Sequence, residues 1–393
     1  MPSSPGRMLA PDLARGFMLL LIALAHAPLL ITGQALVNVD ERVRPASGLA
    51  DQLANLGLTF FVFSRSFPLF AALLGYGLVL IIESRRRRGE PDDEIRARVR
   101  RRGRWMLILG LGMALLVTPV EILAPYGVIT LLIAGVLVRD DRALRRVIIV
   151  LAGVAVITSI LLGFALSAGP AEETPAMALG HLGYAPADLV YRLTSWVFGV
   201  IINVTLFPIA LAVLVGAWAA RRRLLEEPER NLGLLRRIVA VGLPVSILGA
   251  VPLALVGAGV LAPGHGWWAQ ALHVTTGLAG GFAYAAIFGL IGRHVSADAR
   301  WTRPLTAIGR RSLTCYIVME ATLILLSSTA FLGFGARVGP AGALLIGLTA
   351  WLVAALVANL LQAANRAGPA EWLLRRLVNR PRRVAEPARS SGG

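Results

Sequence analysis

The stretch PDLARGFMLLLIALAHAPLLIT (11–32) decides the fold class of this 393-residue chain. From Leu13 onward the stretch is almost wholly apolar, and about 20 apolar residues in a helix cross a bilayer. Pro11 and Asp12 stand where a helix is expected to begin. The stretch therefore predicts a transmembrane helix that also carries Arg15 and His26.

Further apolar runs follow the first one, and together they predict an all-α, polytopic membrane protein. Hydrophobic residues make up 56% of the chain and charged residues 16%, whereas soluble domains carry about 25% charged residues. Pro68 stands inside the long second run. The runs, which predict about ten transmembrane helices, lie near 13–32, 52–82, 105–118, 121–138, 146–166, 190–219, 237–261, 268–292, 312–332 and 341–364.

The basic residues, all of them arginine, set the expected orientation. With a cytoplasmic N-terminus, 34 of the 39 arginines fall in inside segments and four in outside loops, which predicts that both termini are cytoplasmic. This distribution explains the formal charge of +17 without a nucleic-acid partner. We expect a single transmembrane domain over 1–380 and a disordered tail over 381–393. The exclusive use of arginine indicates a GC-rich genome and hence a bacterial inner membrane, with membrane lipids as partners.

The composition also excludes several kinds of chemistry. A chain without lysine forms no lysine Schiff base and has no Walker-type phosphate loop. Its one cysteine, Cys315, excludes an internal disulfide framework and a cysteine-rich metal site, and five histidines leave little for a metal centre. We therefore expect no metal.

Ionisable residues within the predicted spans are the first functional candidates, because charge is costly in a bilayer. Asp12 and Arg15 are three residues apart and share a helix face, and His26 follows Arg15 by eleven residues on that face. The two ends of this pair are about 16 Å apart, which separates an inner-surface cation from a histidine in the outer half of the membrane. In the milder interpretation, Arg15 marks the inner interface and His26 bonds a neighbouring helix.

Two further candidates lie in later spans. His273 follows Trp267 and Trp268, which resemble an outer aromatic belt, so its expected depth is similar to that of His26. In one interpretation the two histidines flank one site, and in the other His273 contacts only interfacial water. Glu320 lies near the middle of its span and needs a partner or a proton. Arg65 is the expected partner of Glu320. Their pair is as consistent with a structural role as with a catalytic one.

Five segments in order resemble known families. PDLARGFMLLLIALAH (11–26) resembles the opening of the transmembrane acyltransferase superfamily, in which a D-x-x-R-G motif begins the first helix. FSRSFPLFAALLGYGL (63–78), EILAPYGV (121–128), GRRSLTCYIVME (309–320) and GPAEWLLRRL (368–377) resemble successive blocks of the YeiB-like family, also catalogued as domain of unknown function 418. On these segments the chain is identified as a member of the YeiB-like family within that superfamily.

The chain departs from the family pattern at three places. The YeiB-like pattern usually has asparagine at the position of His26, and an arginine followed eleven residues later by histidine instead resembles the acyltransferase-3 branch, where that histidine is regarded as catalytic. Met319-Glu320 replaces a Gln-Ser pair. Ser64-Arg65-Ser66 stands where Lys-Phe-Arg is typical, which shifts the positive charge.

The resemblance implies acyl transfer from cytosolic acyl-CoA to a glycan, lipid or small-molecule acceptor at the outer face. Arg15, Arg310 and Arg311 would bind the donor phosphates, and Asp12 would orient Arg15. His26 would act as the base. Tyr316 and Thr314 are candidate donors to the oxyanion or helix-packing polar groups, and supporting roles fall to Arg65, His273 and Glu320.

Two other functions suit the same sequence. A transporter or lipid-translocating protein would also have many spans, glycine-rich helices and few buried charges. A non-catalytic scaffold would tolerate loss of the candidate residues. The oligomeric state stays open, with a homodimer as one option.

Overall fold

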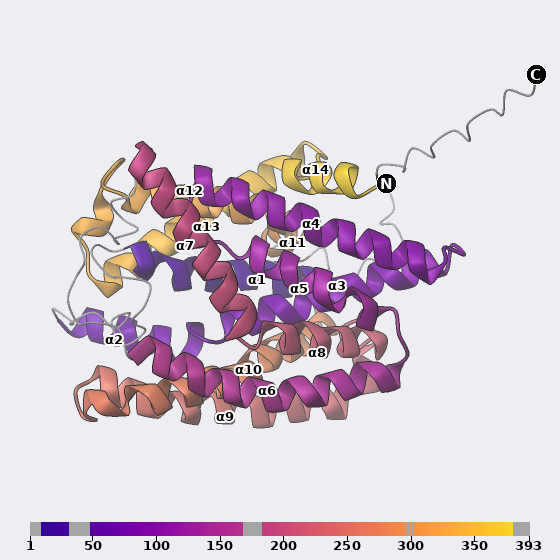
Figure 1. Ribbon diagram of the computed structural model, residues 1–393, viewed down its shortest axis with the longest axis horizontal. Helices are drawn as coiled ribbons and strands as arrows, with labels where there is room; N and C mark the ends of the chain where they lie inside the picture. The colour runs from indigo at the N-terminus through magenta and orange to yellow at the C-terminus, as the bar shows by residue number, and fades with distance from the viewer. Residues whose placement is uncertain (1–8, 31–47, 168–182, 296–298, 300–301, 380–393) are drawn as a thin grey trace, which may run out of the picture.

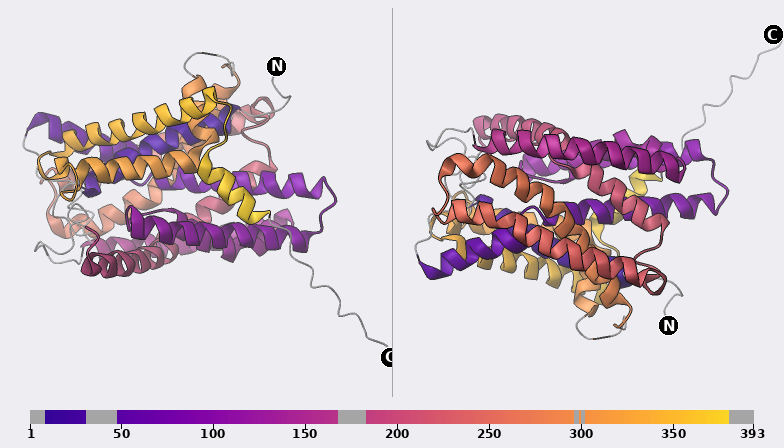
Figure 2. Two further views of the ribbon diagram at one scale, coloured as in Figure 1. Left: turned by 90° about the horizontal axis from the view of Figure 1, so that it is seen from above. Right: turned by 90° about the horizontal axis from the view of Figure 1, so that it is seen from below.

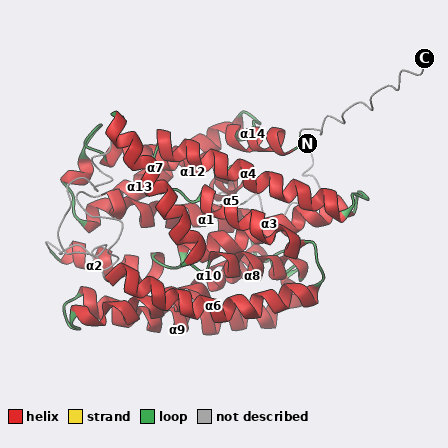
Figure 3. Ribbon diagram, in the orientation of Figure 1, coloured by secondary structure: helices red, strands yellow, loops and turns green. Residues whose placement is uncertain are grey.

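The computed structural model describes residues 9–30, 48–167, 183–295, 299 and 302–379, and the regular structure within these ranges is helical (Figure 3). The predicted tail over 381–393 lies outside the described residues. The α-helices are α1 (Leu9–His26), α2 (Leu49–Gly57), α3 (Ser66–Arg86), α4 (Asp92–Leu116), α5 (Leu123–Leu137), α6 (Asp141–Ser167), α7 (Pro186–Thr205), α8 (Ile209–Arg221), α9 (Leu232–Gly257), α10 (Gly266–Gly292), α11 (Thr302–Arg310), α12 (Ser312–Ser327), α13 (Pro340–Ala363) and α14 (Pro369–Val378).

Most of these helices lie along the long axis of the molecule (Figure 1). Three shorter apolar helices, α5, α8 and α12, accompany seven described segments that are long and apolar enough to cross a membrane. The arrangement confirms an all-helical chain of the multi-pass membrane class. The seven segments are Leu9–Leu30, Leu49–Arg86, Asp141–Ala165, Pro186–Thr205, Pro228–Gly257, Pro263–Gly292 and Pro340–Ala363.

The second apolar run is interrupted in the middle. A π-helical segment, η3 (Leu58–Val62), follows α2, and the chain then turns at 63–65 before α3 begins. Ser64 adopts a left-handed conformation at φ 58°, which interrupts the helical ladder. The break thus precedes Pro68, which occupies the first turn of α3, where proline removes no helical hydrogen bond. The interruption leaves backbone carbonyl groups without helical partners inside the molecule.

The run at 190–219, predicted as a single helix, forms two helices. Helix α7 ends at Thr205 and α8 begins at Ile209, directly after Pro208. Proline has no N–H to donate to the preceding turn, so the helix cannot run through this position without losing a hydrogen bond. Helix α7 therefore lies oblique to the other helices in Figure 1.

Close backbone contact holds α3 and α8 together. A Cβ atom added at Gly75 would collide with the carbonyl oxygen of Val213, and one added at Gly216 would collide with that of Ala72. Small residues permit this close approach of the two backbones. In a bilayer the hydrophobic effect does not drive helices together, so van der Waals packing between such surfaces stabilises the helix pair.

Helix α14 is short and lies between two layers of the bundle. Figure 2 (left) shows it, in yellow, running from the layer that contains α12 and α13 toward α4. Leu374 and Val378 are buried on its inner face, whereas Trp372 is exposed on the other. One wall of the cavity described below comes from this helix.

Candidate functional site

His26, the last residue of α1, contacts Glu320 of α12. The His26 Nδ1 and the Glu320 Oε1 are 2.6 Å apart, and the two side chains are 14% and 2% exposed. The sequence-based pairing of Glu320 with Arg65 is therefore wrong. Helix α12 packs beside α1, whereas Arg65 faces α9 and α10.

Tyr316 and Glu121 continue this polar group toward the inside of the bundle. Tyr316 precedes Glu320 by one turn of α12, and its hydroxyl oxygen accepts a 3.1 Å hydrogen bond from the backbone N–H of Ile122. Glu121 is buried, accepts backbone hydrogen bonds at the start of α5, and receives the Trp196 Nε1–H at 2.9 Å. Trp196 was not among the residues predicted from the sequence, because an aromatic residue in an apolar run gives no polar pattern.

A second polar group surrounds Arg65 at the helix break. The Arg65 guanidinium donates to the carbonyl oxygens of Thr59, Phe63 and Ser246 and to the Ser246 hydroxyl. One of its nitrogens lies 3.2 Å from the ring nitrogens of His273. Arg65 and His273 are each 1% exposed. The guanidinium thus supplies the donors that the interrupted helix lacks.

A cavity of about 390 Å³ lies between α1, α3, α4 and α12. Each of three helices places a polar lining residue near one end of the bundle and an apolar or aromatic one deeper. Asp12 and Arg15 precede Met18 on α1, and Arg102 precedes Met106 on α4. Ser312, next to Arg310, precedes Tyr316 on α12 in the same way. The cavity is therefore polar at one end and apolar at the other.

The polar end of the cavity carries more positive than negative charge. Asp12 Oδ1 lies 3.2 Å from Arg15 Nη1, and Asp12 Oδ2 lies 3.4 Å from Arg310 Nε. The pairing of Asp12 with Arg15, which follows from their spacing, is present in the structure. Arg102 also lines this end; it belongs to the arginine run at 85–104, which suits either nucleotide phosphates or lipid headgroups, and the sequence does not distinguish it from its neighbours. Its place within a run of arginines hides it from sequence inspection.

The deep end of the cavity approaches the His26–Glu320 pair. Tyr316 lines the cavity, and Glu320 follows it by about 6 Å along the axis of α12. On α1, Met18 lines the cavity and His26 follows by about 12 Å. One helix thus presents Arg15 to the polar end and His26 to the group beyond the deep end.

Arg311 and Thr314 have structural contacts. The Arg311 guanidinium donates to the carbonyl oxygen of Arg366 at 2.7 Å and to Gln362 Oε1 at 3.2 Å, and Arg311 is absent from the described lining of the cavity. The Thr314 hydroxyl donates to Glu371 Oε2 at 2.6 Å. These contacts connect the start of α12 to α13 and α14. Arg311 and Thr314 therefore have structural roles and are not proposed to bind the acyl-CoA phosphates or the oxyanion.

Helix α14 is held at both of its ends. Glu371 accepts hydrogen bonds from the backbone N–H groups of Leu313 and Thr314, at the start of α12. At the other end, Asn379 Oδ1 accepts a 2.8 Å hydrogen bond from Arg98 of α4. Leu374, between these anchors, lines the cavity. The closing GPAEWLLRRL motif therefore bridges α12 and α4 beside the cavity.

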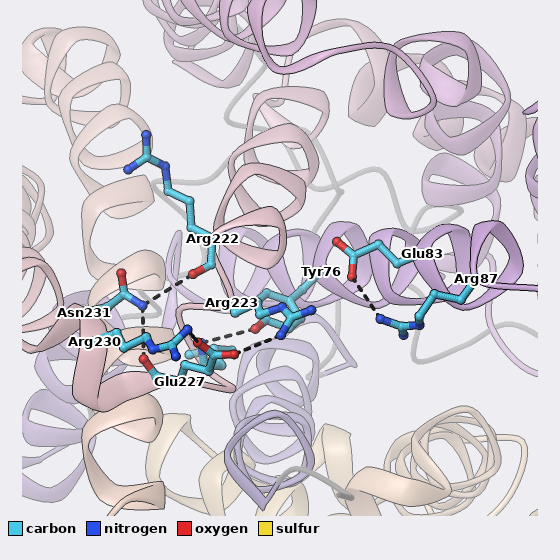
Figure 4. Close-up of polar contacts among 9 residues, drawn as sticks. Tyr76, Glu83, Arg87, Arg222, Arg223, Glu227, Arg230 and Asn231 are labelled. Carbon is cyan, nitrogen blue, oxygen red and sulfur yellow. Dashed lines mark hydrogen bonds and ion pairs between the residues drawn. The ribbon is translucent and has the colours of Figure 1, made fainter.

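Several arginines in the connections between helices are paired with carboxylates. In the connection from α8 to α9, Arg223 and Arg230 lie 2.9 and 2.6 Å from the Glu227 carboxylate, and the Tyr76 hydroxyl receives the Leu225 N–H (Figure 4). The hydrogen bond from Arg223 lowers the pKa of Glu227. The hydrogen bond from Arg85 likewise lowers the pKa of Glu90 in the α3–α4 connection. These ion pairs stabilise the connections.

Groups that would hold a metal ion are not gathered in the described ranges. Among these residues, no three histidine, cysteine or carboxylate side chains form a cluster of the metal-binding kind. The groups that suit a charged ligand are instead the guanidinium groups of the cavity.

A protein-family model matches the C-terminal part of the chain. Residues 219–381 match the family model described as "Protein of unknown function (DUF418)". The motifs at 309–320 and 368–377 lie within this region, and the match confirms the family predicted from the motifs. No curated protein matches the chain.

Proposed function

We propose that this chain, which belongs to the DUF418 family, is a membrane-embedded acyltransferase of the inner membrane. It would move an acyl group from cytosolic acyl-CoA to a hydroxyl or amine acceptor at the outer face. The observation that carries the proposal is the pairing of two sites along α1: an arginine-lined cavity at one end and a carboxylate-bonded histidine at the other.

The proposed topology has ten spans with both termini in the cytoplasm. It counts the break-containing pair α7–α8 as one span and includes α4, α5 and α12, which do not qualify as spans by length and composition. The arginine distribution supports it, and so does the run of arginines that covers the end of α3, the short α3–α4 connection and the first half of α4. In this orientation the polar end of the cavity faces the cytoplasm, where acyl-CoA is made.

The phosphates of the donor would bind at Arg15 and Arg310, with Arg102 beside them. Guanidinium groups form charge-assisted, bidentate hydrogen bonds with phosphate oxygens. Asp12 holds two of these arginines in place. The pantetheine arm would then extend along the apolar part of the cavity toward Tyr316.

His26 would be the general base, and Glu320 would position it. When Nδ1–H of His26 donates to Glu320, Nε2 is left as the acceptor of a proton. The acceptor hydroxyl gives its proton to Nε2, and its oxygen attacks the thioester carbonyl carbon. The tetrahedral intermediate then expels the CoA sulfur, which takes the proton from the imidazolium and leaves as the thiol.

Tyr316 is suited to stabilise the oxyanion of this intermediate. Its oxygen accepts the Ile122 N–H, which leaves its own O–H free to donate. A donor aimed at developing charge in a water-poor site contributes strongly to catalysis. Tyr316 also lies between the cavity and Glu320, where the thioester carbonyl would arrive.

A second function, lipid translocation, is favoured by the shape of the same cavity. Its cationic end lies near the bundle end and its apolar end lies deeper, which matches the orientation of an anionic lipid of the inner leaflet. In that case His26 would be dispensable and the bound lipid would change leaflets without a chemical step.

The test is donor consumption by the protein in liposomes with labelled acetyl-CoA, followed by longer acyl-CoAs, and an outer-face mixture of sugars and lipids. We expect the wild type to consume the thioester and transfer the label. In folded His26→Ala, both rates should fall by at least about a hundredfold. His294→Ala, which changes an exposed histidine after α10, is the matched control and should retain turnover. Turnover that survives in folded His26→Ala would contradict the proposal.

A further inference from the structure

Arg102 differs from the other arginines that line the cavity. Arg15 and Arg310 contact Asp12, whereas the Nε of Arg102 is enclosed and has no hydrogen-bond partner among the described residues. The electrostatic influences on Arg102 include repulsion by Arg15 and attraction by Glu371. A buried donor that lacks an acceptor is costly, by about 1–3 kcal/mol in typical proteins, so a ligand that supplies the acceptor is stabilised at this position.

The charges around the cavity favour an anion. Its ionisable lining residues comprise the three arginines Arg15, Arg102 and Arg310, the carboxylate of Asp12 and the hydroxyl of Tyr316. At neutral pH the arginines exceed the carboxylate by two positive charges. A phosphate monoester carries a charge of about −1.5 to −2 at this pH and balances that excess, and a phosphodiester, with a charge of about −1, balances part of it.

The deeper part of the cavity favours a hydrocarbon or another weakly polar chain. Met18, Met106 and Leu123 form its walls, and Tyr316 contributes a hydroxyl group there. A strongly polar group in this part would lose its bonds to water without finding replacements. The ligand is therefore an amphiphile with its anionic group at the arginines.

We propose that the cavity is a binding site for the phosphate group of an amphiphilic ligand and that Arg102 is its buried phosphate anchor. The phosphate would bond to Arg102 between Arg15 and Arg310, and the attached chain would follow the apolar wall toward Tyr316. Two sources provide this chemistry, coenzyme A and an anionic phospholipid. The choice of coenzyme A rests on the proposed function, but the phosphate site itself does not.

The first experiment measures coenzyme A binding by isothermal titration calorimetry on the full chain in detergent without added lipid. The Arg102→Gln variant removes the charge at similar side-chain length, and we expect the Kd to rise about tenfold or more. Arg104→Gln is the matched control, because Arg104 is exposed on the same helix and changes the net charge equally. We expect Arg104→Gln to bind with a Kd within about twofold of wild type.

The second experiment tests the lipid source. The full chain is purified from bilayers that contain equal amounts of phosphatidylglycerol and phosphatidylcholine, and retained lipid is identified by native mass spectrometry. Selective retention of phosphatidylglycerol by wild type and Arg104→Gln, but not by Arg102→Gln, would support the phosphate site with a lipid as its ligand. If wild type retains phosphatidylglycerol in this way but does not bind coenzyme A in the first experiment, the phosphate site stands and the proposal of acyl-CoA as the donor is overturned.

The proposal is overturned if Arg102→Gln matches Arg104→Gln in both experiments while its melting temperature equals that of wild type. A lowered melting temperature is resolved by Arg102→Lys, which keeps the charge and should restore at least part of the affinity. An Arg102→Lys protein that is folded but binds no better than Arg102→Gln would also overturn the anchor role. Both readouts are binding measurements, so they stay informative when no acyl acceptor has been found and no turnover is seen.

Discussion

The cavity arginines and Arg65 solve the problem of a charge within the bundle in opposite ways. Arg65 is 1% exposed and donates to three carbonyl oxygens and a hydroxyl, all within the protein. At the cavity, Arg15 and Arg310 share the carboxylate of Asp12, and the Nε of the third arginine, Arg102, has no described partner. An arginine whose donors are satisfied internally stabilises the fold, whereas arginines that exceed their acceptors are suited to bind a ligand.

The largest expected effect is on the stability of variants in which Arg65 or a cavity arginine is replaced. Arg65→Met should leave the carbonyl oxygens of Thr59 and Phe63 without donors inside the bundle and lower the free energy of unfolding by about 3 kcal/mol or more. Arg15→Met should change it by less than about 1 kcal/mol, because Arg15 pairs at the partly exposed end of the cavity. Thermal unfolding in detergent measures both. Equal losses for the two variants would refute the distinction.

A second prediction concerns the carboxylate beyond the deep end of the cavity. Glu320→Gln should keep the shape of the side chain but weaken its hold on His26 Nδ1–H, so we expect acyl transfer to fall by about a hundredfold. The melting temperature should change little, since glutamine can still accept this hydrogen bond. Initial rates of thioester loss give the result. Glu371→Gln, which changes a carboxylate of α14 whose hydrogen bonds go to Leu313 and Thr314 at the start of α12, is the control for the rate.

A third prediction narrows the cavity without changing its charge. A Cβ atom at Gly77 would lie 3.2 Å from Arg15 Nη2, so a leucine there would fill part of the cavity and displace this guanidinium. We expect Gly77→Leu to weaken coenzyme A binding about tenfold, as expected for a displaced charge-assisted contact. Gly112→Leu, at a position where the added side chain meets open space, should bind normally. Calorimetry on both variants tests whether coenzyme A binding depends on the volume of the cavity as well as on its charge.

The smallest expected effect belongs to the bridge formed by α14. Glu371→Gln should weaken its bonds to the N–H groups of Leu313 and Thr314 and lower the free energy of unfolding by about 1 kcal/mol, in the range of a lost helix cap. Arg375→Gln should have no measurable effect, because Arg375 is exposed and its Nε–H donates to the carbonyl oxygen of Glu371 within the same helix. Denaturant unfolding compares the two. A larger loss for Arg375→Gln would contradict this account.

Parts of the candidate site were accessible from the sequence because they depend on one helix. The spacing of Asp12 and Arg15 predicts their contact, and the eleven residues from Arg15 to His26 predict a shared face. The partner of Glu320 was not accessible in this way. His26 is 294 residues away in sequence, and nothing in either segment states that α1 and α12 are neighbours.

The sequence by itself determined the fold class and the family. The length and composition of the apolar runs require helices in a bilayer, since only helices satisfy all backbone groups within one segment there. The motifs at 309–320 and 368–377 identified the family that the match over 219–381 confirms.

Only the tertiary structure decided which charged side chains bond to other groups of the protein and which line the cavity. It assigned Arg65 to the helix break, Arg311 to the end of α13 and Glu320 to His26, and it brought Arg102 beside Arg15 and Arg310. The physical reason is that the partner of a buried charge is set by packing between helices far apart in the chain, while the sequence shows only that a charged residue stands in an apolar run and that its burial needs a partner.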